Sequence, residues 1–223
     1  MHLTRASLLT FLLLCWLDAL PATGQSAGLL PQDEASRQPD FFTFRARLLV
    51  SLAQRDTLTL LNGIASEIRN TFGDDNGVDA FRRRWRLTEP DSELWSELAT
   101  VLALGGTFQN DSTFVAPYTF SRWPAEYDAF DYLAVVGSGV RVRGEPSLTA
   151  PVLTRLGFEV VQRARTPRRS LTTAEAALWE PIQLRDGRIG YIARRWLRSP
   201  VGYRAVFMRR GLEWIMVSFI AGD

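Results

Sequence analysis

The sequence predicts an α+β protein with a mainly helical N-terminal domain, then a small β-barrel and a C-terminal β-hairpin. Three observations support this fold class. Between residues 40 and 125, apolar residues recur mostly at helical spacing. After Asn110 the period changes to two, and turn residues separate the short strand candidates up to residue 198. Two further apolar runs, within residues 199–223, are joined by a turn at Gly211 and predict the final hairpin.

Residues 1–27 have the layout of a secretory signal peptide. A weakly basic start precedes the apolar run of residues 8–17, and small residues follow Pro21. That run is too short to span a bilayer, so we expect cleavage near residues 24–27. An uncleaved anchor or a lipoprotein site at Cys15 are the alternatives. The expected product is periplasmic or secreted, without a transmembrane segment in the mature chain.

The residues that remain after such a cleavage limit the available chemistry. The only cysteine (Cys15) and the only histidine (His2) both lie in residues 1–27, and the chain contains no lysine. Thiol nucleophiles, Ser-His triads, Schiff-base lysines and Cys/His zinc sites are therefore excluded from the mature chain. We expect no catalytic residue, no metal site and no cofactor.

The segment from residue 28 to residue 125 is interpreted as a flexible leader followed by helices. Residues 28–39 are polar and lack periodicity, whereas a first helical face follows Asp40. A second helix is expected to start at Asp56 and to bury Leu61, Ile64, Ile68 and Phe72. Two more helices, at residues 78–85 and from residue 88 to Gly105, complete the predicted helical domain.

Two polar or aromatic stretches were weighed as sites. The run Asp74-Asp75-Asn76-Gly77-Val78-Asp79 is rich in oxygen ligands, but its spacing does not fit an EF-hand, so a solvated turn is favoured. The aromatic run at residues 114–124 would suit a sugar-binding platform. Packing between domains is the more common role of such a run and is our expectation.

Residues 130–198 carry an ordered set of motifs. They are Val140-Arg141-Val142-Arg143, Glu145-Pro146-Ser147, Trp179, Asp186-Gly187-Arg188, Gly190-Tyr191-Ile192 and Trp196-Leu197. This set resembles the bacterial SH3-like (SH3b) family. The resemblance implies a small five-stranded barrel in a non-catalytic module, some relatives of which bind peptidoglycan. The Asp-Gly pair predicts a two-residue hairpin turn of type I′.

Six residues of this region are candidates for ligand binding. Aromatic side chains could stack on a ligand, and arginines could pair with carboxylates. The candidates are Arg143, Trp179, Arg185, Arg188, Tyr191 and Trp196. Alternatively, Trp179 and Tyr191 close the core of the barrel.

A second likeness concerns the two ends of the chain. The helix ending in Gln54-Arg55-Asp56 and the final strand Trp214-Ile215-Met216-Val217-Ser218-Phe219 resemble elements of cone-shaped NTF2-like domains. This likeness implies that the barrel is inserted into, or docked on, an incomplete cone.

The net charge of +2 conceals two oppositely charged parts. Residues 28–138 carry 16 acidic residues and 10 arginines, a net charge of −6. Residues 139–212 carry 15 arginines and 5 acidic residues, a net charge of +10. The basic part is suited to an acidic polymer, or else the two parts dock on each other.

These observations predict an exported, non-catalytic binding or scaffolding protein of the bacterial cell envelope. Its expected partner is peptidoglycan, another acidic envelope polymer or a protein, and not nucleic acid. The alternative is a hydrolase targeted to the cell wall that uses carboxylates of the N-terminal domain as acid and base.

Overall fold

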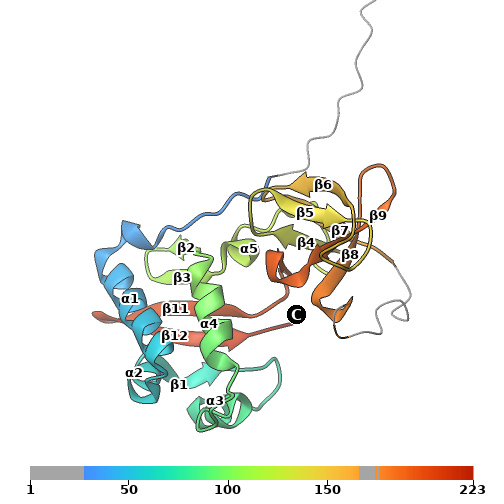
Figure 1. Cartoon of the computed structure of the whole chain (residues 1–223). Helices are drawn as coiled ribbons and strands as arrows, with labels where there is room; N and C mark the ends of the chain where they lie inside the picture. The colour runs from blue at the N-terminus through green and yellow to red at the C-terminus, as the bar shows by residue number, and fades with distance from the viewer. Residues whose placement is uncertain (1–27, 166–173, 175, 223) are drawn as a thin grey trace, which may run out of the picture.

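The computed structural model describes residues 28–165, 174 and 176–222 (Figure 1). In this part of the chain, twelve strands form two sheets, and five α-helices and three 3-10 helices accompany them. The helices are α1 (Pro39–Gln54), α2 (Thr57–Asn62), α3 (Val78–Trp85), α4 (Leu94–Ala103), α5 (Tyr118–Ser121), η1 (Ala35–Arg37), η3 (Ala176–Leu178) and η4 (Arg194–Trp196). The strands are β1 (Ile64–Arg69), β2 (Thr107–Asn110), β3 (Thr113–Ala116), β4 (Tyr132–Val135), β5 (Val140–Arg143), β6 (Val152–Leu156), β7 (Val160–Arg163), β8 (Trp179–Gln183), β9 (Ile189–Ala193), β10 (Leu197–Arg198), β11 (Arg204–Arg210) and β12 (Glu213–Ile220). The predicted signal peptide lies outside the described residues.

The predicted fold class is wrong, because the described chain is mostly β-structure and its first part is not mainly helical. A five-stranded sheet with the order β1-β12-β11-β3-β2 combines strands from both ends of the chain. β12 pairs in parallel with β1 and antiparallel with β11, which in turn pairs with β3. The C-terminal hairpin is therefore the centre of this sheet, and residues 130–198 are inserted between its strands. We call this sheet and its helices the first unit.

The second predicted helix fails at a specific point. Asp56 does cap α2, since its carboxylate accepts a hydrogen bond from the backbone N–H of Thr59 at 3.1 Å. The helix ends at Asn62, however, and Ile64 and Ile68 belong to β1. Residues four positions apart share a face in a helix and also in a strand, so their spacing fits both structures. Phe72, expected to be buried, is 48% exposed.

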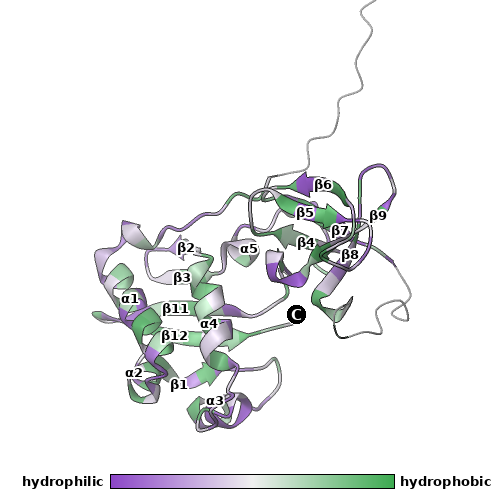
Figure 2. Cartoon of the chain, in the orientation of Figure 1, coloured by the Kyte–Doolittle hydropathy of each residue, from purple (hydrophilic) through white to green (hydrophobic). Residues whose placement is uncertain are grey.

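Helices α1 and α4 lie across one face of the five-stranded sheet (Figure 1). Phe41 of α1 is fully buried there, with its ring centroid 4.3 Å from that of Phe114 and 4.9 Å from that of Trp214. Hydrophobic residues mark both layers, on the helices and on β11 and β12 beneath them (Figure 2). This layer of aromatic and aliphatic side chains is the core of the first unit.

The second unit is an antiparallel sheet of seven strands in the order β10-β4-β7-β8-β9-β5-β6. This finding replaces the predicted small five-stranded barrel. Strands far apart in the sheet order share one core, because Val142 of β5 and Leu197 of β10 belong to the same buried cluster. The sheet therefore curls around its own apolar face. The other members of this core are Leu133, Val135, Val140, Val161, Ile182 and Ile192.

A third apolar cluster joins the two units. Tyr118 of α5 packs there with Ala134 and Val160 of the second unit and with Leu29. The backbone N–H of Leu29 donates to the carbonyl of Phe158 at 2.7 Å. The first residues of the expected flexible leader are thus bonded to the second unit, and the aromatic segment before residue 124 contributes to packing between the units.

Ion pairs also connect the basic part of the chain with the acidic part. Arg198 of β10 pairs with Glu97 of α4 at 2.7 Å. On the C-terminal hairpin, Arg209 pairs with Asp40, and Arg210 pairs with Glu67. Contacts inside the molecule therefore account for some of the charge division found in the sequence, but not for the arginines on the outer surface of the second unit.

Candidate functional site

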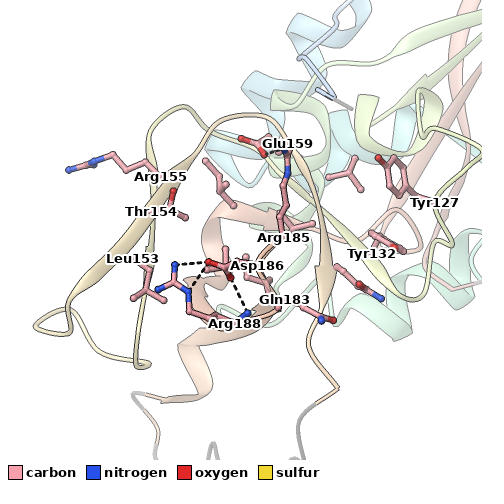
Figure 3. Close-up of a pocket in the computed structure, with 17 residues that line it drawn as sticks. Tyr127, Tyr132, Leu153, Thr154, Arg155, Glu159, Gln183, Arg185, Asp186 and Arg188 are labelled. Carbon is pink, nitrogen blue, oxygen red and sulfur yellow. Dashed lines mark hydrogen bonds and ion pairs between the residues drawn. The ribbon is translucent and has the colours of Figure 1, made fainter. Parts of the chain in front are cut away.

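The candidate site is an open groove in the second unit, with a volume of about 900 Å³. One side is the edge strand β6, and the other side is formed by β7 and by the hairpin that joins β8 to β9 (Figure 3). Acidic and basic side chains line the groove, together with two tyrosines and two glutamines. The polar lining residues are Tyr127, Tyr132, Thr154, Arg155, Glu159, Gln162, Gln183, Arg185, Asp186 and Arg188.

The turn of the β8–β9 hairpin places two of the predicted residues, Arg185 and Arg188, at the groove. The N–H of Gly187 donates to the carbonyl of Leu184 at 2.9 Å, and Gly187 has a φ of 83°. This geometry corresponds to a three-residue loop with glycine in the left-handed region, so the predicted two-residue type I′ turn is corrected. Glycine is required there because other residues rarely adopt that φ.

The charges at this turn are held in fixed pairs. The Nε and Nη2 atoms of Arg188 lie 2.8 Å and 2.7 Å from Oδ2 of Asp186 (Figure 3). The hydrogen bond from Arg188 lowers the pKa of the Asp186 carboxyl, and the same contact raises the pKa of Arg188. Arg185 lies 3.8 Å from Glu159, which is a longer and weaker pair. Both guanidinium groups stay largely exposed to solvent.

The tyrosines stand on the side of the groove nearest the first unit. Tyr127 and Tyr132 have ring centroids 4.9 Å apart with the planes tilted by 54°. The indole N–H of Trp123 donates to the carbonyl of Tyr127 at 2.8 Å and so fixes the backbone of this segment. The groove thus offers an aromatic surface beside cationic groups, which suits a ligand with both carboxylate and apolar parts.

Two of the six predicted residues are buried and do not line the groove. Arg143 is 8% exposed, and its Nη1 donates to the carbonyl of Ala150 at 2.5 Å, which closes the loop between β5 and β6. Trp179 is 4% exposed. For Trp179 this burial favours the packing alternative over ligand stacking.

The remaining two predicted residues lie elsewhere on the second unit. Tyr191 is half-buried in β9, where it pairs with Arg143 of β5. Trp196 is 41% exposed and packs over Gly137, where an added Cβ would come within 2.8 Å of the indole ring. The guanidinium of Arg195 lies 5.9 Å from the centre of that ring. Of the six predicted residues, the structure brings only Arg185 and Arg188 together at the groove.

Sequence reasoning named only Arg185 and Arg188 of the groove, and the residues that it missed include Tyr127, Tyr132, Arg155 and Glu159. Arg155 could have been found, since it is a charged residue within a predicted strand and charged side chains rarely lie in a core. The tyrosines fall near the boundary between the predicted domains. Their convergence depends on how the sheet curls, which no local pattern reveals.

The first unit has a smaller groove of about 500 Å³ beside α3. Arg82, Arg83, Arg86 and Glu89 contribute its charged side chains. Such a set does not provide the paired carboxylates that the hydrolase alternative requires. The described residues include no group of three or more His, Cys, Asp or Glu side chains placed to hold a metal ion.

The acidic run after β1 forms a turn in the structure. The side-chain carbonyl of Asn76 accepts hydrogen bonds from the backbone N–H groups of Asn70 and Thr71 at 2.7 Å and 3.1 Å. Asp75 pairs with Arg83 of α3 at 2.9 Å. These contacts fit the solvated turn expected from the sequence.

Among the described helices, none combines the length and the apolar character that crossing a membrane would require. Comparisons with protein-family models, with curated proteins and with solved structures gave no match to this chain.

Proposed function

We propose that this chain is an exported, non-catalytic binding or scaffolding protein of the bacterial cell envelope. Its ligand is an acidic envelope polymer, most simply peptidoglycan, held in the groove of the second unit. The observation that carries this proposal is the exposed pair Arg185 and Arg188, which flanks the β8–β9 turn in the groove that Tyr127 and Tyr132 also line. The SH3b-like motifs of residues 130–198 support the same assignment by resemblance.

The charges of the groove favour a ligand that carries carboxylates. Guanidinium groups bind carboxylates strongly, and two nitrogens of Arg188 already converge on a single carboxylate oxygen, Oδ2 of Asp186. Arg185 is largely exposed and lies 3.8 Å from Glu159, so its guanidinium keeps N–H donors available to a ligand. The carboxylates of peptidoglycan stem peptides are ligands of this kind, and their apolar side chains suit the tyrosine side of the groove.

The experiment is co-sedimentation of the purified mature protein with isolated peptidoglycan at low and high salt. At low salt the protein should enter the pellet. At about 0.5 M salt most of it should return to the supernatant, because exposed ion pairs are screened at such ionic strength. Protein that stays in the supernatant even at low salt contradicts the proposal.

A further inference from the structure

Two arginines face each other directly across the β5–β6 hairpin. Arg141 of β5 and Arg155 of β6 are Cα partners in the antiparallel register. Directly opposite residues project from the same face of the sheet, with Cβ atoms about 4.5–5.5 Å apart. Both side chains are exposed. Like charges in this arrangement destabilise a hairpin unless a third group neutralises them.

No carboxylate in the described part of the chain forms an ion pair with either arginine. The two acidic side chains that line the groove are engaged elsewhere, since Asp186 pairs with Arg188 and Glu159 pairs with Arg185. Arg155 donates one hydrogen bond, a long one of 3.3 Å, to the carbonyl of Gly139. Its guanidinium points outward from the rim of the groove, away from the Asp186–Arg188 pair (Figure 3).

We infer that Arg141 and Arg155 together form a site for a phosphate group. A carboxylate has two oxygens and one charge, so one guanidinium fork satisfies it. A phosphate carries up to two charges and offers oxygens to both forks at once, which removes the repulsion between the two arginines. Binding of this group therefore stabilises the folded second unit.

The site goes beyond the proposed groove function, because it lies on the outer face of β5 and β6. Arg155 alone belongs to both places, since it also lines the rim of the groove. A phosphate-bearing polymer of the envelope could contact this face without entering the groove. The inference therefore has its own test, which uses small anions and does not involve peptidoglycan.

The experiment measures the melting temperature of the mature protein in sodium phosphate and in sodium chloride at equal, low ionic strength. In millimolar phosphate the wild type should melt about 2–4 °C higher than in chloride. Arg141→Gln and Arg155→Gln should each abolish this difference. Each should also melt at or above the wild type in chloride, because the like-charge contact is removed.

Arg47→Gln is the matched control, since Arg47 is an exposed arginine of α1 in the first unit and the charge change is the same. It should retain the full phosphate effect, and so should Arg185→Gln. An equal response of the wild type to phosphate and chloride overturns the inference. A phosphate effect that survives in Arg141→Gln and Arg155→Gln also overturns it, because general salt stabilisation would then explain the shift.

Discussion

Arg198 at the end of β10 and Glu97 on α4 form an ion pair of 2.7 Å that joins the two units of the molecule. Their side chains are only 20% and 29% exposed, so water screens this pair less than the pairs on the outer surface. The contact links residues 101 positions apart, and it lies beside the chain that leads from the second unit back into the first sheet. It is one of the contacts by which the basic part of the chain docks on the acidic part.

A double-mutant cycle with Glu97→Gln and Arg198→Gln should give a coupling energy of about 1 kcal/mol, the upper end of the usual range for exposed pairs. The measurement is urea unfolding of the wild type, both single variants and the double variant. The exposed pair Arg86–Asp91 is the control and should couple by less than about 0.5 kcal/mol. Additive effects at Glu97 and Arg198 would show that the pair does not hold the units together.

Tyr118 is expected to make the protein sensitive to alkali. Burial raises the pKa of Tyr118 from 10.0 to about 12, because the ionised phenol would be poorly solvated. A raised pKa means that the folded state favours the protonated form, so stability is complete below pH 10 and falls as pH rises towards 12. Tyr118→Phe should therefore lose less stability than the wild type between pH 10 and 12, as measured by urea unfolding at each pH.

The same substitution has a second consequence at neutral pH. The buried hydroxyl of Tyr118 has no hydrogen-bond partner among the described residues. Its removal should leave the stability at pH 7 unchanged or slightly higher, since an unsatisfied polar group is lost. A destabilised Tyr118→Phe variant at pH 7 would mean that the hydroxyl is bonded in solution.

Trp179→Ala should destabilise the protein by about 3–5 kcal/mol, because the removed indole is buried and leaves a cavity. Trp196→Ala removes the same side chain from a partly exposed position and should cost clearly less, because less apolar surface is lost from the packing. Thermal or urea unfolding compares the two variants. Similar stability of both would place Trp179 outside the core, which would restore its role as a stacking surface.

The pKa of the Glu67 carboxyl should depend on its ion pair with Arg210. The hydrogen bond from Arg210 holds the pKa of Glu67 at about 2, below its ordinary value of 4.5. Arg210→Gln should raise the pKa of Glu67 towards 4.5, since its main stabilising partner is lost. An NMR titration of the Glu67 carboxyl measures this directly. An unchanged pKa would show that the pair does not persist in solution.

The fold was predictable only where local patterns determine the structure. The face of α1, the cap at Asp56 and the final hairpin follow from spacing and turn residues. The first sheet was not predictable in this way, because β1 pairs in parallel with β12. Ile64 is thus the partner of Met216, a residue far away in the sequence. An isolated strand such as β1 has no local partner, so its apolar spacing predicts a continued helix equally well.

In the candidate site, too, local features could be predicted from the sequence and long-range contacts could not. The Asp186-Gly187 turn fixes the positions of Arg185 and Arg188, and that turn is local. The burial of Arg143 depends instead on the loop that returns to Ala150, and the contribution of the tyrosines depends on the curl of the sheet. The exposure of Arg155 could be expected from its charge within a predicted strand, but its pairing with Arg141 depends on the register of the hairpin.

The proposed binding of an acidic envelope polymer through Arg185 and Arg188 is tested by comparing two matched double variants. The apparent affinity for isolated peptidoglycan at low salt is compared between Arg185→Gln/Arg188→Gln and the matched variant Arg83→Gln/Arg86→Gln. Both variants lose two exposed, paired arginines of similar accessibility. The groove variant should bind about tenfold more weakly, a loss of about 1.4 kcal/mol, while the matched variant should bind like the wild type. Equal weakening of both variants, or none in either, would contradict it.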